Sequence, residues 1–182
     1  MTRATDRHLA GIVLAGGQSS RMGENKADLV WRGQTLVAHA QASLRTAGCD
    51  PVLVSGRPDL PNGFADSRKA AGPAHALLDS LDQVPNTVDG LLVVPVDMPL
   101  LRTEDLAPLT RHKPDRPCAW MTHPLPLYLP AAKVEISRDD VWSIRKLITD
   151  LGVNWLELDE KRLARLRNIN TPEQFAALSE QE

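Results

Sequence analysis

Two glycines, an arginine and a lysine closely follow the first apolar run of the chain, in the stretch IVLAGGQSSRMGENKADL at residues 12–29. A connection between a strand and a helix usually takes about two to six residues, so this longer one is unusual. Gly16 and Gly17 can bring backbone N–H groups close to an anion, and Arg21 and Lys26 add positive charge. The stretch therefore predicts a phosphate site, with a glycine-rich turn carrying two solvated cations as the alternative.

The spacing excludes two common phosphate loops. A Walker A loop needs adjacent Gly and Lys followed by Ser or Thr, whereas Gly23 and Lys26 are separated here and Ala27 follows. The glycines also do not form the G-x-G-x-x-G fingerprint of dinucleotide-binding folds. Ligands of open α/β sheets bind beyond the carboxyl ends of the strands, and this loop follows the first predicted strand. Its location therefore favours a ligand site.

Asp97 is the first candidate metal ligand. It directly follows the apolar run at residues 90–96 and precedes Met98 and Pro99. Mg²⁺ is usually bound by one or two carboxylates together with substrate phosphates, so Asp97 could hold it against a triphosphate. The alternative is a turn-forming aspartate, which is common near proline-containing loops. The opening loop favours the metal role.

Asn168 and Asn170 precede the predicted start of the last helix. Thr171, Pro172 and Gln174 have the spacing of a capping box with proline in the first turn. That pattern explains these three residues but neither asparagine. On an extended segment, residues two apart point to the same side, so we expect Asn168 and Asn170 to face a common space.

Short apolar runs and helical patterns alternate along the chain. Strands are predicted at residues 9–14, 51–55, 90–96, 118–121, 125–130 and 154–158. Helices are predicted from Thr35 to about Gly48, from Pro73, from about Thr103, over residues 139–151 and after Thr171. This order predicts a single α/β domain with a Rossmann-like, mostly parallel sheet and helices on both faces.

Composition bounds the class of protein. The chain has 182 residues, of which 42% are hydrophobic and 24% charged, as in ordinary globular domains. A net charge of −2 argues against a nucleic-acid partner. No apolar stretch approaches the roughly 20 residues of a membrane span, and neither a signal peptide nor a CxxC pair is present. We expect a cytoplasmic protein without a membrane partner.

The full pattern of the opening loop, L-A-G-G-x-x-x-R-M-G-x-x-K, resembles the signature of the molybdenum cofactor guanylyltransferase family of MobA-like nucleotidyltransferases. The resemblance continues, in order, through GP at residues 72–73, VPVDMPLL at 94–101, HPLPLY at 123–128 and NINTPEQF at 168–175. It covers nearly the whole chain, and its two outer motifs are the specific ones. It implies the nucleotide-diphospho-sugar transferase type of fold, with a nucleotide-binding half at about 8–100 and an acceptor-binding half at about 101–182.

The resemblance also implies roles for individual residues. Lys26, Arg21 and Asp97 would be catalytic, and Asp97 would be the magnesium ligand. Asn168 and Asn170 would lie on the acceptor side, near the metal. The nucleotide would contact Leu14, Ala15, Gly16, Gly17, Lys26, Asp66 and Asp97.

The implied reaction transfers GMP from GTP to the terminal phosphate of molybdenum-molybdopterin, with Mg²⁺ as cofactor and pyrophosphate as leaving group. The L-A-G-G and VDMP motifs resemble the guanylyl branch of the family. Transient contact with other cofactor-biosynthesis proteins or with a molybdoenzyme chaperone would be compatible with that role.

Two departures keep alternatives open. The family usually reads G-P-L-A-G where this chain has Gly72-Pro73-Ala74-His75-Ala76, and the stretch between Trp120 and His123 is short. One alternative is a nucleotidyltransferase of another specificity, using CTP or taking a sugar or small-molecule phosphate as acceptor. The other is a non-catalytic cofactor carrier that keeps the nucleotide loop.

Overall fold

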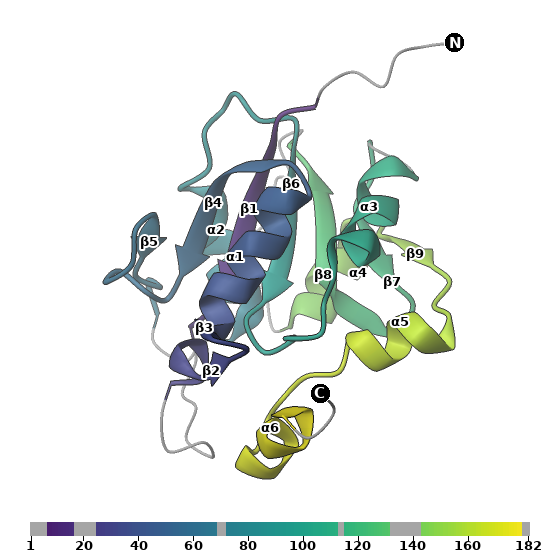
Figure 1. The fold of residues 1–182 in the computed structure, drawn as a ribbon. Coiled ribbons are helices and arrows are strands. Elements are labelled where there is room, and N and C mark those ends of the chain that lie inside the picture. Colours follow the sequence, from purple (N-terminus) through teal and green to yellow (C-terminus); the bar gives the residue numbers. More distant parts are fainter. Residues whose placement is uncertain (1–6, 17–24, 69–71, 113–114, 132–142, 180–182) are drawn as a thin grey trace.

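A seven-stranded sheet with the order β5-β4-β1-β6-β8-β7-β9 forms the centre of the protein (Figure 1). The computed structural model describes residues 7–16, 25–68, 72–112, 115–131 and 143–179. The strands are β1 (Leu9–Leu14), β4 (Cys49–Ser55), β5 (Gly63–Phe64), β6 (Gly90–Pro95), β7 (Cys118–Trp120), β8 (His123–Pro130) and β9 (Asn154–Leu156).

Both strand directions occur in this sheet. The pairs β5–β4, β4–β1, β1–β6 and β7–β9 are parallel, whereas β8 is antiparallel to both β6 and β7. The predicted mostly parallel sheet is confirmed, and β8 is the strand that departs from it.

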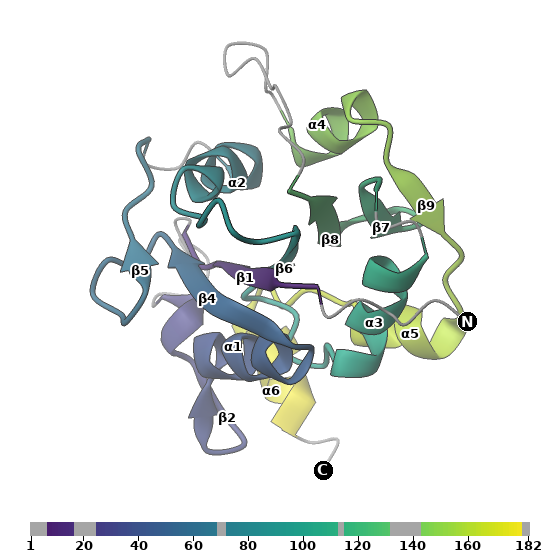
Figure 2. The same ribbon diagram turned by 90° about the horizontal axis from the view of Figure 1, so that it is seen from above.

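Helices cover both faces of the sheet, as predicted. Helices α1 (Leu36–Thr46) and α3 (Thr103–Arg111) lie on one face, and α2 (Pro73–Leu81) and α4 (Ile144–Asp150) lie on the other (Figure 2). Residues of the central strands alternate between the two layers: Val13 joins the first and Ile12 the second. All six residues of β1 are buried, as expected for a strand covered on both sides.

Local signals place the helix ends where the sequence predicts them. The Thr35 hydroxyl accepts a hydrogen bond from the Ala38 N–H at 3.3 Å and caps α1. Before α6 (Pro172–Ser179), Thr171 and Gln174 form the predicted capping box, with Gln174 N–H donating to the Thr171 hydroxyl at 3.3 Å. Of the helix predicted over residues 139–151, residues 139–142 lie outside the described part, and α4 begins after its Ser143 cap.

Four small elements and one short helix carry no clear signal in the sequence. They are the 3-10 turn η1 (Lys26–Asp28), the hairpin strands β2 (Val30–Trp31) and β3 (Gln34–Thr35), β5, and α5 (Glu160–Arg165). The strands among them have two residues each, too few to show a period. Helix α5 buries none of its own residues, so it has no apolar stripe to recognise.

Both cysteines are buried, and they lie in strands β4 and β7, which three other strands separate in the sheet. Burial raises the pKa of Cys49 to about 12. Among the described residues, no helix is both long and apolar enough to cross a membrane.

Gly90, at the start of β6, offers a test of the core. A Cβ atom there would lie 2.6 Å from Cε2 of Tyr128, whose ring is fully buried. We expect Gly90→Ala to lower the free energy of unfolding by about 1–3 kcal/mol, since overpacking forces a shift of the ring or the backbone. Urea denaturation measures this, with Gln34→Ala in the exposed hairpin as control, and an unchanged midpoint for Gly90→Ala would contradict the packing.

Candidate functional site

The carboxyl ends of β1 and β6 meet at one edge of the sheet. Leu14 is in register with Pro95, and the N–H of the next residue, Val96, donates to the Leu14 carbonyl at 3.1 Å. The segments that leave the two strands, one toward Lys26 and the other at Asp97, therefore begin side by side. This is the edge at which open α/β sheets bind ligands.

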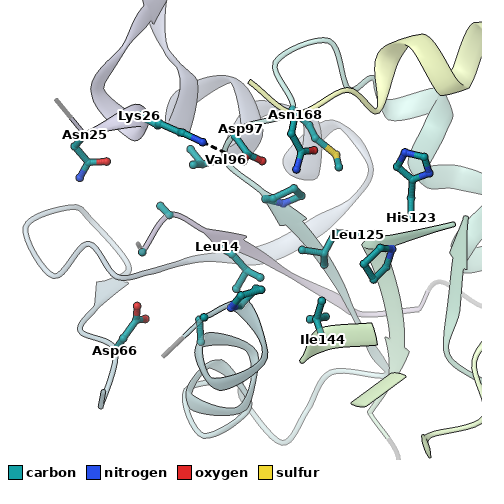
Figure 3. A pocket seen from close by; sticks show the side chains of 18 residues that line it. Leu14, Asn25, Lys26, Asp66, Val96, Asp97, His123, Leu125, Ile144 and Asn168 are labelled. Carbon is teal, nitrogen blue, oxygen red and sulfur yellow. Dashed lines mark ion pairs between the residues drawn. The ribbon is translucent and has the colours of Figure 1, made fainter. Parts of the chain in front are cut away.

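A cavity of about 410 Å³ lies at this edge (Figure 3). Its walls come from segments spread over most of the chain, and 18 residues line it in Figure 3. They are Leu14, Ala15, Gly16, Asn25, Lys26, Asp66, Gly72, Pro73, Ala76, Pro95, Val96, Asp97, Met98, His123, Pro124, Leu125, Ile144 and Asn168.

Lys26, Asp97 and Asn170 meet at one side of this cavity. The Lys26 ammonium donates to Oδ1 of Asn170 at 2.8 Å and lies 3.5 Å from Oδ2 of Asp97. Lys26 is held on η1, which Asn25 caps by accepting a hydrogen bond from the Ala27 N–H at 3.0 Å. Residues far apart in the chain are thus brought together around one cation.

Burial dominates the electrostatics of Asp97. Removal of the carboxylate from water raises the pKa of Asp97, and the nearby Lys26 ammonium opposes that shift. Within the described part of the chain, Oδ1 of Asp97 is buried and accepts no hydrogen bond. A buried carboxylate oxygen without a donor requires an explanation. A divalent cation is a suitable one, because Mg²⁺ can be held by a single carboxylate together with substrate phosphates and water.

The asparagine segment is fixed against Asp97 by its backbone. The N–H of Ile169 donates to the Asp97 carbonyl at 2.8 Å, and the Ile169 side chain is buried. On either side of it, Asn168 lines the cavity and Asn170 contacts Lys26. The common orientation expected for the two asparagines is therefore seen, toward the space beside Asp97.

Asp66 lies on the opposite side of the cavity from Lys26, as Figure 3 shows. Its Oδ1 accepts a hydrogen bond from the Ser55 hydroxyl at 2.5 Å. A Cβ atom on Gly16 would overlap Oδ2 of Asp66, so a larger residue at this position would require the Asp66 side chain to move. The next residue, Ser67, is held by the buried Asp79 of α2, which accepts from the Ser67 N–H at 2.7 Å and from its hydroxyl at 2.9 Å.

A second, more apolar wall comes from the carboxyl-terminal half. His123, Pro124 and Leu125 of β8 form it together with Ile144 of α4. Because β8 is antiparallel to β6, its first residues lie at the edge where β6 ends. The motif HPLPLY by itself predicts no role for His123. The residue reaches the cavity only because β8 is antiparallel to β6, and a single sequence does not give the direction of a strand.

Gly17, Arg21 and Ala76 are three further positions that the sequence singles out. Gly17 and Arg21 lie outside the described residues, and their roles stay predictions. Ala76, which stands where the family usually has glycine, is buried and lines the cavity. Its methyl group therefore occupies space at the cavity wall that glycine would leave open.

Comparison with known proteins is consistent with the resemblance seen in the sequence. Residues 11–148 match the family described as the MobA-like NTP transferase domain. A molybdenum cofactor guanylyltransferase of Xanthomonas euvesicatoria pv. vesicatoria is 36% identical, over 94% of this chain and 95% of its own length.

Solved structures show the same fold. A molybdopterin-guanine dinucleotide biosynthesis protein A from Archaeoglobus fulgidus superposes with a TM-score of 0.68 at 18% identity, covering 94% of this chain and 97% of its own. A Mycobacterium tuberculosis protein crystallised in complex with manganese superposes with a TM-score of 0.66 at 19% identity, covering 96% and 100% of the two chains.

The raised pKa of Asp97 predicts a stability cost that depends on pH. Since the folded pKa lies above the unfolded one, the ionised carboxylate destabilises the folded protein at neutral pH, and this penalty vanishes below the unfolded pKa of about 3.9. We expect Asp97→Asn to gain stability relative to wild type at pH 8, and this gain to shrink as the pH falls to 4. Urea titrations across that range measure it.

Asp59→Asn is the control of opposite sign. The Arg57 guanidinium, donating to Asp59 at 2.9 and 2.7 Å, lowers the pKa of that carboxyl, so its stabilising effect is present at neutral pH and lost on acidification. A stability difference for Asp97→Asn that stayed constant with pH, or grew toward pH 4, would contradict the burial effect.

Proposed function

The chain belongs to the MobA-like NTP transferase family, and we propose that it transfers GMP from GTP to the terminal phosphate of molybdenum-molybdopterin. The products are molybdopterin guanine dinucleotide and pyrophosphate. The observation that carries the proposal is the convergence of Lys26, Asp97, Asn168 and Asn170 at the edge of the sheet where the opening loop begins. The name of the Xanthomonas relative, which is similar over nearly its whole length, supports the choice of substrates.

The amino-terminal part of the cavity is assigned to the nucleotide. Leu14, Ala15 and Gly16 line it at the end of β1, and Asp66 faces them from the loop after β5. In the proposal, Lys26 neutralises the triphosphate, and the predicted partners Gly17 and Arg21 belong to the same loop. The nucleotide-binding half would then extend over about residues 8–100.

The other wall is assigned to the acceptor. Asn168 offers an amide beside Asp97, while Leu125 and Ile144 supply apolar surface on which a flat ring system can pack. An amide group can both donate and accept hydrogen bonds, which suits it to orient a phosphate or a polar ring edge. The acceptor-binding half would then extend over about residues 101–182.

The proposed reaction needs little covalent chemistry from the protein. A terminal phosphate oxygen of the acceptor forms a bond to the α-phosphorus of GTP, and the bond from that phosphorus to the bridging oxygen of pyrophosphate breaks. A phosphate monoester is already largely ionised at neutral pH, so no general base is required. The protein contributes by holding both substrates in line and by neutralising charge with Lys26.

Asp97 is the residue proposed to hold Mg²⁺, through the buried Oδ1 that accepts no hydrogen bond within the described part of the chain. A bound divalent cation would neutralise charge on the triphosphate. The manganese complex of the Mycobacterium tuberculosis structure supports a divalent metal in this fold.

One observation favours a different specificity on the same fold. The Ala76 methyl group lines the cavity where the family usually has glycine. It would narrow the nucleotide side of the cavity and could select another base or a smaller acceptor, such as a sugar phosphate.

The other alternative is a cofactor carrier, in which the nucleotide would bind without turnover.

Binding of GTP, CTP and ATP, each with Mg²⁺, separates these possibilities by calorimetry. We expect GTP to bind at least tenfold more tightly than the other two and to lose affinity when the metal is chelated. Pyrophosphate release with molybdenum-molybdopterin then distinguishes an enzyme from a carrier. Selective binding of another triphosphate would refute the guanylyl assignment, and the absence of binding at millimolar GTP would refute the nucleotide site.

Lys26→Ala and Asp97→Ala test the central pair. We expect each to lower kcat/KM by at least about 10²–10³-fold, since each removes a charge placed against the reacting phosphates. Steady-state pyrophosphate release measures this, and thermal unfolding confirms a cooperative fold.

Lys146→Ala and Asp150→Ala are the matched controls. These residues form an exposed ion pair on α4 and do not line the cavity, so their removal should leave kcat/KM within twofold of wild type. Full activity of either Lys26→Ala or Asp97→Ala would show that the site has been assigned wrongly.

A further inference from the structure

Asp105 is a fully buried carboxylate that lies outside the cavity. Its two oxygens accept hydrogen bonds from Arg165 Nε at 2.9 Å, Arg165 Nη2 at 2.5 Å, Arg162 Nε at 3.2 Å and the backbone N–H of Arg102 at 3.1 Å. Burial of a charge is costly unless it is paired and hydrogen-bonded, and Asp105 meets both conditions. Such a cluster is weak evidence for net stability, but the paired geometry of the Arg165 contact fixes an orientation.

Core packing of α3 fixes the position of the Asp105 carboxylate, and Arg162 and Arg165 extend from α5 to reach it. Its neighbours on α3, Leu106 and Leu109, are completely buried. The Trp120 indole N–H on β7 donates to the Asp105 carbonyl at 3.1 Å, and the Arg162 guanidinium stacks on the Trp120 ring at 4.3 Å. Asp105 is therefore a fixed point in the structure.

Helix α5 depends on this fixed point. None of its own six residues is buried, and Leu163 is largely exposed, so no apolar face of α5 attaches it to the protein. It contributes Arg162 and Arg165, and its capping residue Leu166 enters the core. Figure 2 shows α5 beside α3, and Figure 1 shows the chain continuing from α5 toward α6.

The asparagine segment begins directly after α5. Asn168 follows Arg165 by three residues, which can span at most about 10 Å. Ile169 then donates its N–H to the Asp97 carbonyl, and Asn170 accepts from Lys26. Beyond it, the Gln174 side chain accepts from the Asn170 N–H at 2.6 Å. The segment is thus held before Asn168 by the Asp105 cluster and the buried Leu166, and after Asn170 by the start of α6.

We propose that Asp105, through its paired hydrogen bonds to Arg165, is a positioning residue that holds Asn168 and Asn170 against Asp97 on the acceptor side of the site. Asp105 touches no substrate and acts through α5. The inference rests on the proposed function for its kinetic consequence, but its structural consequence can be measured without any substrate.

Asp105→Asn is the first test, because the amide keeps the size of the side chain and removes its charge. We expect at least a tenfold loss in kcat/KM for molybdenum-molybdopterin. The Kd for GTP with Mg²⁺ by calorimetry should rise by a smaller factor, because Lys26 loses Asn170 but keeps its ion pair with Asp97. Apart from Lys26, the nucleotide wall is formed by β1, the loop after β5 and α2, and within the described part of the chain the Asp105 carboxylate is hydrogen-bonded to none of these. A merely structural role would lower kcat/KM and the number of GTP-binding sites together, in proportion to the folded fraction.

Asp79→Asn is the matched control, since Asp79 is also a buried carboxylate but holds Ser67, next to Asp66, on the nucleotide side. It should weaken GTP binding and leave the KM for the acceptor unchanged.

If Asp105→Asn fails to fold, Arg165→Lys tests the positioning role instead, because lysine keeps the positive charge and loses the paired hydrogen bonds. Acceptor kinetics equal to wild type in a folded Asp105→Asn or Arg165→Lys would overturn the proposal.

Hydrogen exchange separates failure of this proposal from failure of the proposed function. The Ile169 N–H should exchange at least tenfold faster in Asp105→Asn or Arg165→Lys, while β1 and β6 keep their protection. If the wild-type protein transfers no nucleotide, the proposed function is wrong, and the exchange result still tests the positioning. Unchanged exchange at Ile169 would overturn it.

Discussion

The parallel pairing of β1 with β6 is the constraint on which the site depends. Because the two strands run side by side in the same direction, the segments that leave them begin at one edge of the sheet. One segment leads to Lys26, and the other begins with Asp97, so a cation and a carboxylate distant in sequence come within 3.5 Å. The 2.8 Å contact from Lys26 to Asn170 then brings the last segment of the chain to the same point.

The buried Asp97 beside Lys26 lowers the stability of the fold but leaves a carboxylate oxygen available to a cation. Burial would be costly for the charged Asp97 alone, and Lys26 offsets only part of that cost, which is why the pKa of the carboxyl remains raised. A buried oxygen without a donor is a poor arrangement for folding and a suitable one for a cation. Functional sites commonly keep such unfavourable groups, and the rest of the fold holds them in place.

Two other buried carboxylates support the two walls of the cavity from outside. Asp79 holds the loop that carries Asp66 through Ser67, and Asp105 holds α5, which leads into Asn168. Helix α5 itself buries no residue, and only Leu166 and Ile169 are buried in the segment that follows it. Hydrogen bonds to a buried charge are directional, so they can fix such segments where packing alone would leave them free to shift.

The sequence by itself determined the order of the longer strands and of every helix except α5, the helix caps at Thr35 and Thr171, and the site residues that follow strands. Periodicity, capping and strand ends are local properties. It also carried the family resemblance. Only the tertiary structure decided that β8 runs antiparallel, which brings His123 and Leu125 to the cavity, and that Asp105 anchors α5. Strand direction and the partner of a buried charge depend on residues distant in the chain, and no local pattern encodes them.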